Sequence, residues 1–133
     1  MISKTKKVVC TASAILAAFW LQSSSMASEK FVNVGVDDNG NPFLLDTTTM
    51  GDSEKGFGSV IKVYQQSDNL MTEVLLQTSC GDDKLWIVGS RVYSSNGVKL
   101  SENKQREEIP ARGSSPGANA ILYYCQSIGA RGW

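Results

Sequence analysis

The stretch LMTEVLLQTSCGDDKLWIVGSRVYS (residues 70–94) decides the fold that the sequence predicts. It contains two runs rich in aliphatic and aromatic residues, 70–79 and 84–94, which are separated by the turn sequence Cys-Gly-Asp-Asp. Two such runs on either side of a compact polar turn are typical of neighbouring antiparallel strands. The stretch therefore predicts two neighbouring strands of an antiparallel sheet.

Further strand candidates precede and follow this pair. Valines alternate over residues 30–36, the turn DDNGN follows, and residues 42–46 resume as a short strand. After a polar loop (47–56), residues 57–66 are rich in strand-forming residues, with one expected face made of Phe57, Ser59, Ile61 and Val63. A Ser-Asn-Gly turn leads from residue 94 into a last strand at 98–100. The expected sheet is an antiparallel meander of about five or six strands.

The end of the chain changes from strand to helix periodicity. Ser115 followed by Pro116 is typical of a helix start. Apolar residues then recur at helical spacing until Gly129, namely Ala118, Ile121, Leu122, Cys125 and Ile128. We therefore expect an α+β fold in which this helix packs on one face of the sheet. A final strand over 120–126, which would suit Tyr123 and Tyr124, is the alternative.

Aromatic and charged residues give two further expectations. Phe57 with Tyr64, and Trp86 with Ile87, are expected to fill the core face of the sheet. The stretch ENKQREE (102–108) mixes both charge signs, which predicts a solvated loop or strand edge.

Residues 1–27 have the features of a secretory signal. Lys4, Lys6 and Lys7 precede the uncharged stretch 8–21, and Ser-Met-Ala at 25–27 offers small residues to a signal peptidase. A membrane anchor is the alternative, but 14 helical residues span roughly 21 Å of a hydrocarbon core of roughly 30 Å. Cys10 stands at the beginning of the apolar stretch, whereas a lipid anchor needs a cysteine after it. We expect export to the periplasm or the extracellular space and no transmembrane span in the mature chain.

Cleavage changes the composition of the protein. Residues 28–133 form a single predicted domain with 10 basic and 13 acidic residues, a net charge of −3, and no basic cluster of the kind that binds nucleic acid. Cys80 and Cys125 remain as an even pair in an oxidising compartment, which predicts a structural disulfide. A redox-active pair would normally have a C-x-x-C spacing.

The sequence provides no recognisable catalytic or metal-binding constellation. The absence of histidine excludes Ser-His-Asp and Cys-His pairs and histidine metal ligands, and three cysteines cannot complete a four-thiolate zinc site. The acidic doublets at 82–83 and 107–108 would point to opposite faces of a strand. The turn at 37–40 can be aligned with an EF-hand calcium loop, but Gly35 would then occupy the first ligand position, and glycine has no side-chain ligand. We therefore expect no enzyme, no cofactor and no metal.

Several weak motifs occur together in one order along the mature chain. They are a D-x-x-G turn (37–40), FLLDTT (43–48), VIKVY (60–64), a first cysteine at 80, Y-x-x-x-G (93–97), Ile-Pro (109–110) with Ser-Ser-Pro (114–116), and YYC (123–125). In this order the chain resembles the surface-adhesin protein E-like family of small exported bacterial domains. The resemblance implies an antiparallel sheet with an attached C-terminal helix and a disulfide between Cys80 and Cys125. Members studied as adhesins bind host matrix proteins, and no family motif defines ligand-binding residues here.

The expected function is therefore that of a non-catalytic protein-binding or envelope structural domain, whose partner is a protein of unknown identity. Because a sheet of this kind has edges, we expect a homodimer or strand addition by a partner. The alternative is an inhibitor of a secreted or envelope enzyme such as lysozyme, which would present the loop 47–56 or 111–116.

Overall fold

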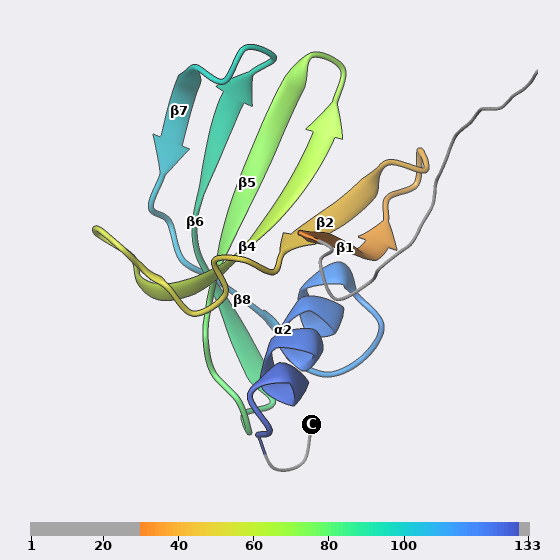
Figure 1. The fold of residues 1–133 in the computed structure, drawn as a ribbon, viewed down its shortest axis with the longest axis vertical. Coiled ribbons are helices and arrows are strands. Elements are labelled where there is room, and N and C mark those ends of the chain that lie inside the picture. The colour runs from red at the N-terminus through yellow and green to blue at the C-terminus, as the bar shows by residue number, and fades with distance from the viewer. Residues whose placement is uncertain (1–29, 131–133) are drawn as a thin grey trace, which may run out of the picture. The chain divides into compact units, whose positions relative to one another are not determined.

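The computed structural model describes residues 30–130, so the predicted signal segment 1–27 lies outside the described residues. Within residues 30–130, eight strands precede one helix, and Figure 1 shows how the sheet and the helix are arranged. The strands are β1 (Phe31–Val36), β2 (Pro42–Asp46), β3 (Ser53–Glu54), β4 (Gly58–Ser67), β5 (Leu70–Gln77), β6 (Lys84–Ser94), β7 (Lys99–Asn103) and β8 (Glu107–Pro110). The helix α2 spans Pro116–Ser127. Within residues 30–130, no helix has the length and apolar character needed to cross a membrane.

The strands form one antiparallel sheet in the order β1-β2-β4-β5-β6-β7, with β3 added to β4 and β8 added to β6. The predicted antiparallel α+β architecture is confirmed, but the sheet has eight strands where five or six were expected. The two additional strands come from segments predicted to be polar. β3 lies in the predicted loop 47–56, and β8 begins inside the charged stretch 102–108. Pairing with the longer strands β4 and β6 stabilises these short segments, which have no strand pattern of their own.

Local capping signals set both ends of α2. The hydroxyl of Ser115 accepts a hydrogen bond from the amide of Ala118 at 3.2 Å, and Pro116 occupies the first turn. At the other end Gly129, with φ of 73°, donates to the carbonyl of Gln126, and the amide of Ala130 donates to that of Cys125. This is a Schellman cap, which needs a residue that tolerates positive φ. The alternative of a final strand over 120–126 is therefore wrong.

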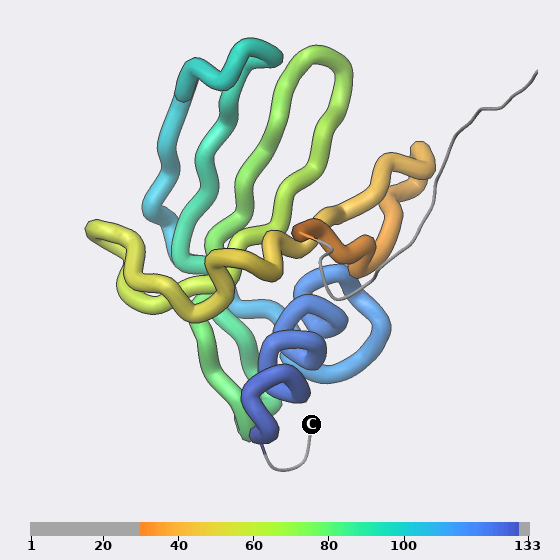
Figure 2. Tube along the Cα trace, viewed as in Figure 1, coloured from red at the N-terminus to blue at the C-terminus, as the bar shows by residue number. Residues whose placement is uncertain are grey.

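The helix packs on β1, β4 and β8, and the main core lies beneath it. Fully buried Leu45, Ile61 and Ile121 represent this core, together with Cys125. The predicted apolar face of the helix is wrong at Leu122 and Ile128, which remain 37% and 58% exposed. A turn of about 100° per residue moves position 122 away from the row of Ala118, Ile121 and Cys125. Figures 1 and 2 show the hairpins β4–β5 and β6–β7 extending beyond the helix.

A second, smaller core lies on the opposite face of the sheet. Buried Val60, Leu75 and Val88 form it, and Phe57 and Trp86 pack against it. The prediction that Trp86 and Ile87 lie on the same face is wrong, because successive residues of a strand point to opposite sides of the sheet. Phe57 also lies opposite the face of Ile61, since Gly58, with φ of 81°, breaks the alternation where β4 begins. Phe57 and Trp86 do pack against a core of the sheet, as expected, but Ile87 packs against the main core on the other face and Tyr64 contacts Glu73. The prediction that these four residues fill one core face is therefore wrong.

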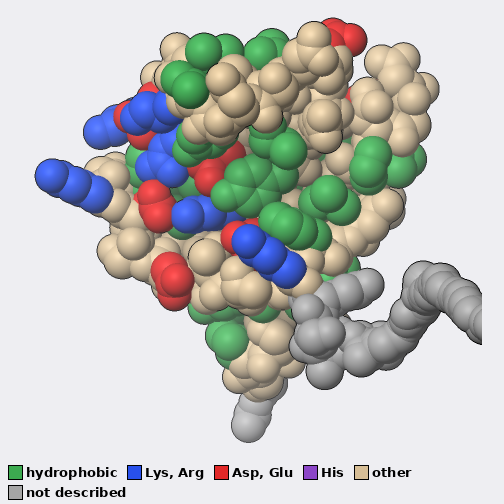
Figure 3. Space-filling model, turned by 45° about the horizontal axis from the view of Figure 1, so that its top comes forward, with side chains coloured by type: hydrophobic (Ala, Val, Ile, Leu, Met, Phe, Trp, Pro, Cys, Tyr) green, Lys and Arg blue, Asp and Glu red, His purple; other side chains and the backbone are tan. Residues whose placement is uncertain are grey.

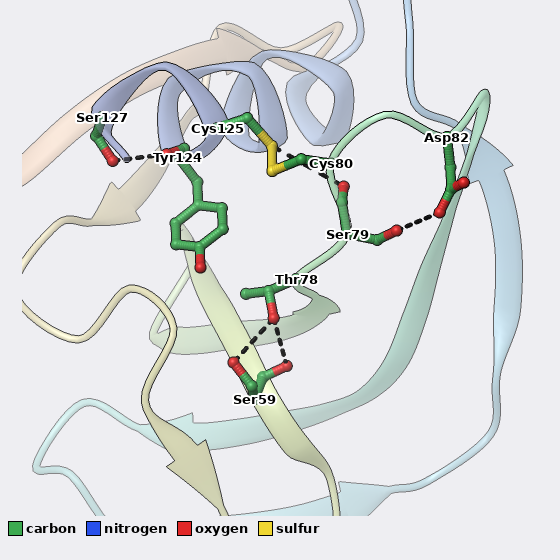
Figure 4. Close-up of a disulfide and its surroundings, with 8 residues drawn as sticks. All are labelled: Ser59, Thr78, Ser79, Cys80, Asp82, Tyr124, Cys125 and Ser127. Carbon is green, nitrogen blue, oxygen red and sulfur yellow. Dashed lines mark hydrogen bonds between the residues drawn. A yellow bond between two sulfur atoms is a disulfide. The ribbon is translucent and has the colours of Figure 1, made fainter. Parts of the chain in front are cut away.

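A disulfide joins Cys80, just after β5, to Cys125 in the helix, with 5.8 Å between the two Cα atoms. Figure 4 shows the bond between the helix and the loop that follows β5. Ser79 beside it donates a hydrogen bond to the carboxylate of Asp82 and so fixes the turn into β6. The predicted disulfide is confirmed, and it ties the helix to the centre of the sheet.

Candidate binding surface

Arg91 joins four strands on the face of the sheet opposite the helix. From β6, its Nη1 lies 2.9 Å from Oε1 of Glu73 on β5, and its Nε lies 2.8 Å from Oε2 of Glu102 on β7. Nη2 lies 2.9 Å from Oε1 of Glu54 on β3. The strand register places Glu73 and Glu102 directly opposite Arg91 on its two neighbours. We call these four residues, with Lys62, the Arg91 cluster.

The centre of the cluster is withdrawn from water, whereas the side chains of Glu54 and Glu102 at its ends remain 24% and 28% exposed. The side chain of Glu73 is 3% exposed, that of Arg91 12% and that of Lys62 13%. Lys62 lies 2.9 Å from the second carboxylate oxygen of Glu54, and Tyr64 donates its phenolic hydrogen to Glu73. Each buried charge therefore has an ionic or hydrogen-bonding partner, as a stable buried charge requires.

The electrostatic environment favours the charged forms of Glu54, Glu102 and Arg91 and the protonated form of Tyr64. The hydrogen bond from Lys62 lowers the pKa of Glu54 despite the opposing effect of burial, and Arg91 adds to the shift. A hydrogen bond from Arg91 likewise lowers the pKa of Glu102. Burial, and then the bond to Glu73, raises the pKa of Tyr64. Burial disfavours the charge on Arg91, but its three carboxylate partners outweigh that effect and raise its pKa. The shifts of Glu54, Glu102 and Arg91 all favour their charged forms, so their ion pairs fix the geometry of the cluster.

Phe57 is held over the same face. The guanidinium carbon of Arg91 lies 5.1 Å from the centre of its ring, and Nζ of Lys104 lies 5.5 Å from it. Gly89 makes room for the ring, since a Cβ at that position would lie 2.3 Å from Cε1 of Phe57. Figure 3 shows acidic and basic side chains gathered together beside hydrophobic ones. The β3–β4 hairpin is therefore fixed to the sheet by an aromatic contact as well as by ion pairs.

The edge strand β7 presents a different kind of surface. All five of its residues are exposed, and it pairs only with β6 among the described residues. Val98, which precedes the strand, and Leu100 near its start are 55% and 56% exposed. Within the strand, Nζ of Lys99 lies 3.5 Å from Oε1 of Glu102. This edge offers unpaired backbone groups together with exposed apolar and charged side chains.

The remaining sequence candidates are separated or used locally. Glu107 lies opposite Ile87 and Glu108 opposite Trp86 in the β6–β8 pairing, so the two carboxylates of this doublet face opposite ways. The carboxylate of Asp37 accepts hydrogen bonds from two backbone amides of its own turn and from the side chain of Gln65. These bonds lower the pKa of Asp37, and the bond from the amide of Asn41 contributes most. Among residues 30–130, no three cysteine, aspartate or glutamate side chains gather as a metal site.

Sequence reasoning missed the Arg91 cluster. Its members are spread over 49 positions of the chain, and no sequence motif links them. The one available signal is that charged Glu73 and Arg91 interrupt otherwise apolar strands, where an unpaired charge would be costly.

Comparison of the chain with protein-family models, with curated proteins and with solved structures found no match. The resemblance to the surface-adhesin protein E-like family remains a prediction.

Proposed function

We propose that this protein is an exported, non-catalytic binding domain that pairs with a protein partner through the edge of β7. One observation carries the proposal, namely that β7 is exposed along its whole length at the end of the sheet. An exposed edge can accept another strand because its outward amide and carbonyl groups have no ladder partner. In this view the Arg91 cluster has a supporting role, since it holds β7 to the sheet through Glu102.

The charges on β7 favour a second copy of the same chain as the first partner to test. A β-bulge at Leu100 places Lys99 and Glu102 on the same face of β7. Two β7 strands that pair antiparallel about the point between Leu100 and Ser101 then bring Lys99 of each copy opposite Glu102 of the other. Directly opposed charges of opposite sign stabilise cross-strand pairs, and a shifted register loses this match. Such an interface is self-complementary, as a two-fold dimer requires.

Light scattering on the purified, oxidised protein over a range of concentrations tests this proposal. We expect a concentration-dependent dimer that Leu100→Asp weakens at least tenfold, because the change places a charge on the apolar part of the edge. Leu122→Asp, the same change at an exposed position of α2, is the matched control and should leave the dimer intact. A strict monomer at millimolar concentration contradicts self-association.

A second candidate function, inhibition of a secreted or envelope enzyme such as lysozyme, is favoured by the rigid attachment of the β3–β4 hairpin. Glu54 anchors this hairpin to Lys62 and Arg91, which would prearrange it for insertion into a cleft. Inhibition of lysozyme that Glu54→Gln weakens would support this function over edge pairing. Unchanged lysozyme activity at a large excess of the protein would contradict it.

A further inference from the structure

An apolar pocket of about 300 Å³ lies on the helix side of the sheet, away from β7. Its floor is formed by side chains of β4, β5 and β6, namely Val63, Val74, Leu76 and Ile87. Phe43 of β2 and Ile109 of β8 form two of its walls. The volume is at the lower end of the range of small-molecule sites.

The pocket exists because α2 begins to one side of the central strands. The helix packs on β1, β4 and β8, so that Val74 on β5 remains only half-buried. Gly117 brings the start of the helix close to β8, since a Cβ there would lie 2.7 Å from Cδ1 of Ile109. The first turn of the helix thus closes one end of the pocket.

The chemistry of the lining restricts the ligand. Ser115 is the one lining residue with a polar side chain, and its hydroxyl already accepts the hydrogen bond that caps the helix. Apart from that one hydroxyl the lining has no polar side chain, so the buried part of a ligand must be apolar, because an unmatched polar group would lose its hydration. A methylene group is about the size of a water molecule, which occupies roughly 30 Å³. The pocket volume of about 300 Å³ therefore has room for about ten methylene groups.

The rim favours a negatively charged head group on such a chain. Pro116 and Gly117 of the first helical turn line the pocket, and this turn contains no acidic side chain. The positive end of the helix dipole therefore borders the pocket without an internal counter-charge from that turn. Glu107 lies on the same face of the sheet beside Ile87 but does not line the pocket.

From the pocket and its rim we infer that this protein binds a medium-chain alkyl carboxylate, with the chain over Val74 and the carboxylate near Gly117. The inference is separate from edge pairing by β7, since the pocket and the edge share no residue. Either one can therefore fail without the other.

Calorimetric titration of the purified, oxidised protein with hexanoate, octanoate, decanoate and dodecanoate, each below its micellar concentration, tests the chain. The affinity should rise about fourfold for each added methylene until the chain has about ten carbons, and then level off. Decylammonium should bind about fivefold more weakly than decanoate, because the helix dipole opposes its charge. Absence of saturable binding, or equal binding of the two head groups, overturns the inference.

Two pocket variants and one matched control complete the test. Val74→Phe should fill the pocket and weaken decanoate at least tenfold, whereas Val98→Phe, the same change at an exposed position, should have no effect. Ile109→Ala enlarges the pocket and should move the levelling-off to longer chains, which gives an independent result if Val74→Phe fails to fold. Decanoate binding that neither pocket variant alters overturns the inference.

Discussion

Arg91 and Glu73 form an ion pair across the pairing of β5 and β6, with Nη1 of Arg91 2.9 Å from Oε1 of Glu73. Glu73 is among the few buried charged residues of the described chain. Its ionised form is tolerable there because Arg91, Tyr64 and Tyr93 all direct hydrogen-bond donors at it. The same guanidinium holds β3 and β7. This pair therefore stands at the centre of the face of the sheet opposite the helix, which we call the open face.

Arg91→Gln should lower the free energy of unfolding by about 3–5 kcal/mol, because it leaves Glu73 buried without its counter-charge. Urea unfolding at neutral pH measures the change. Lys99→Gln serves as the control, since its ion pair with Glu102 is half exposed and should contribute less than about 1 kcal/mol. Equal effects of the two substitutions would show that burial of the pair is unimportant.

Acid should destabilise the protein through Glu54. Its pKa is lower in the folded chain than its ordinary value of 4.5, so the unfolded chain takes up its proton first as the pH falls. Stability from this group is therefore complete above that value and is lost progressively below it. Urea midpoints measured between pH 7 and pH 3 should decline more steeply for the native protein than for Glu54→Gln. Parallel declines would contradict this role of Glu54.

Tyr64 should resist ionisation while the protein is folded. Burial and the neighbouring carboxylate of Glu73 raise its pKa above the ordinary value of 10.0. The contribution of Tyr64 to stability is complete below that value and is lost as the pH rises above it. In a spectrophotometric titration up to about pH 11, Tyr64→Phe should therefore leave the tyrosinate absorbance of the folded protein unchanged. A smaller absorbance in the variant would mean that Tyr64 does ionise in this range.

Replacing both Cys80 and Cys125 by serine should reduce the free energy of unfolding by about 2–4 kcal/mol. The two cysteines are 45 positions apart, and their bond restricts the unfolded chain by closing a long loop. Thermal melting under oxidising conditions measures the loss. The native protein treated with a reductant should have the same melting temperature as the double variant. A reductant that does not change the melting temperature of the native protein would argue against this contribution.

Gly89→Ala should destabilise the protein by about 1–3 kcal/mol through overpacking. The new Cβ would lie 2.3 Å from Cε1 of Phe57 and 2.7 Å from the carbonyl oxygen of Asn103. Adding Phe57→Leu should recover part of the loss, because it removes the closer of the two clashes. Ser90→Ala, at the next position of β6, should have a smaller effect in the same unfolding assay. Failure of Phe57→Leu to recover stability would place the strain at Asn103 instead.

Sequence reasoning succeeded where the determining interactions are local. Ser115 and Pro116 marked the start of α2, and Gly129 marked its end, because a helix cap needs only residues within one turn of each other. The central strands followed from their apolar and aromatic composition. The pairing of Cys80 with Cys125 followed from a count, since only two cysteines remain after the predicted cleavage.

Prediction was poorer where a segment depends on its neighbours. β3 has two residues and β8 has four, and both owe their strand conformation to the longer strand that each one pairs with. The face on which Phe57 lies was mispredicted because Gly58 interrupts a period of two that the sequence appeared to continue. The apolar pocket depends on where the start of α2 lies relative to β5, which no local signal specifies.

By itself, the sequence determined the class of fold, the helix with its caps and the covalent link, all of which arise from local patterns or from a count. Only the tertiary structure decided the open face. Leu76 pairs with Ile87 while Leu75 pairs with Gly89, a one-residue shift in the register of β5 and β6. Continuing the first pairing without the shift would place Ser90 opposite Glu73. The shift instead brings Arg91 to that position, because a slip of one residue moves every later side chain of a strand to the other face.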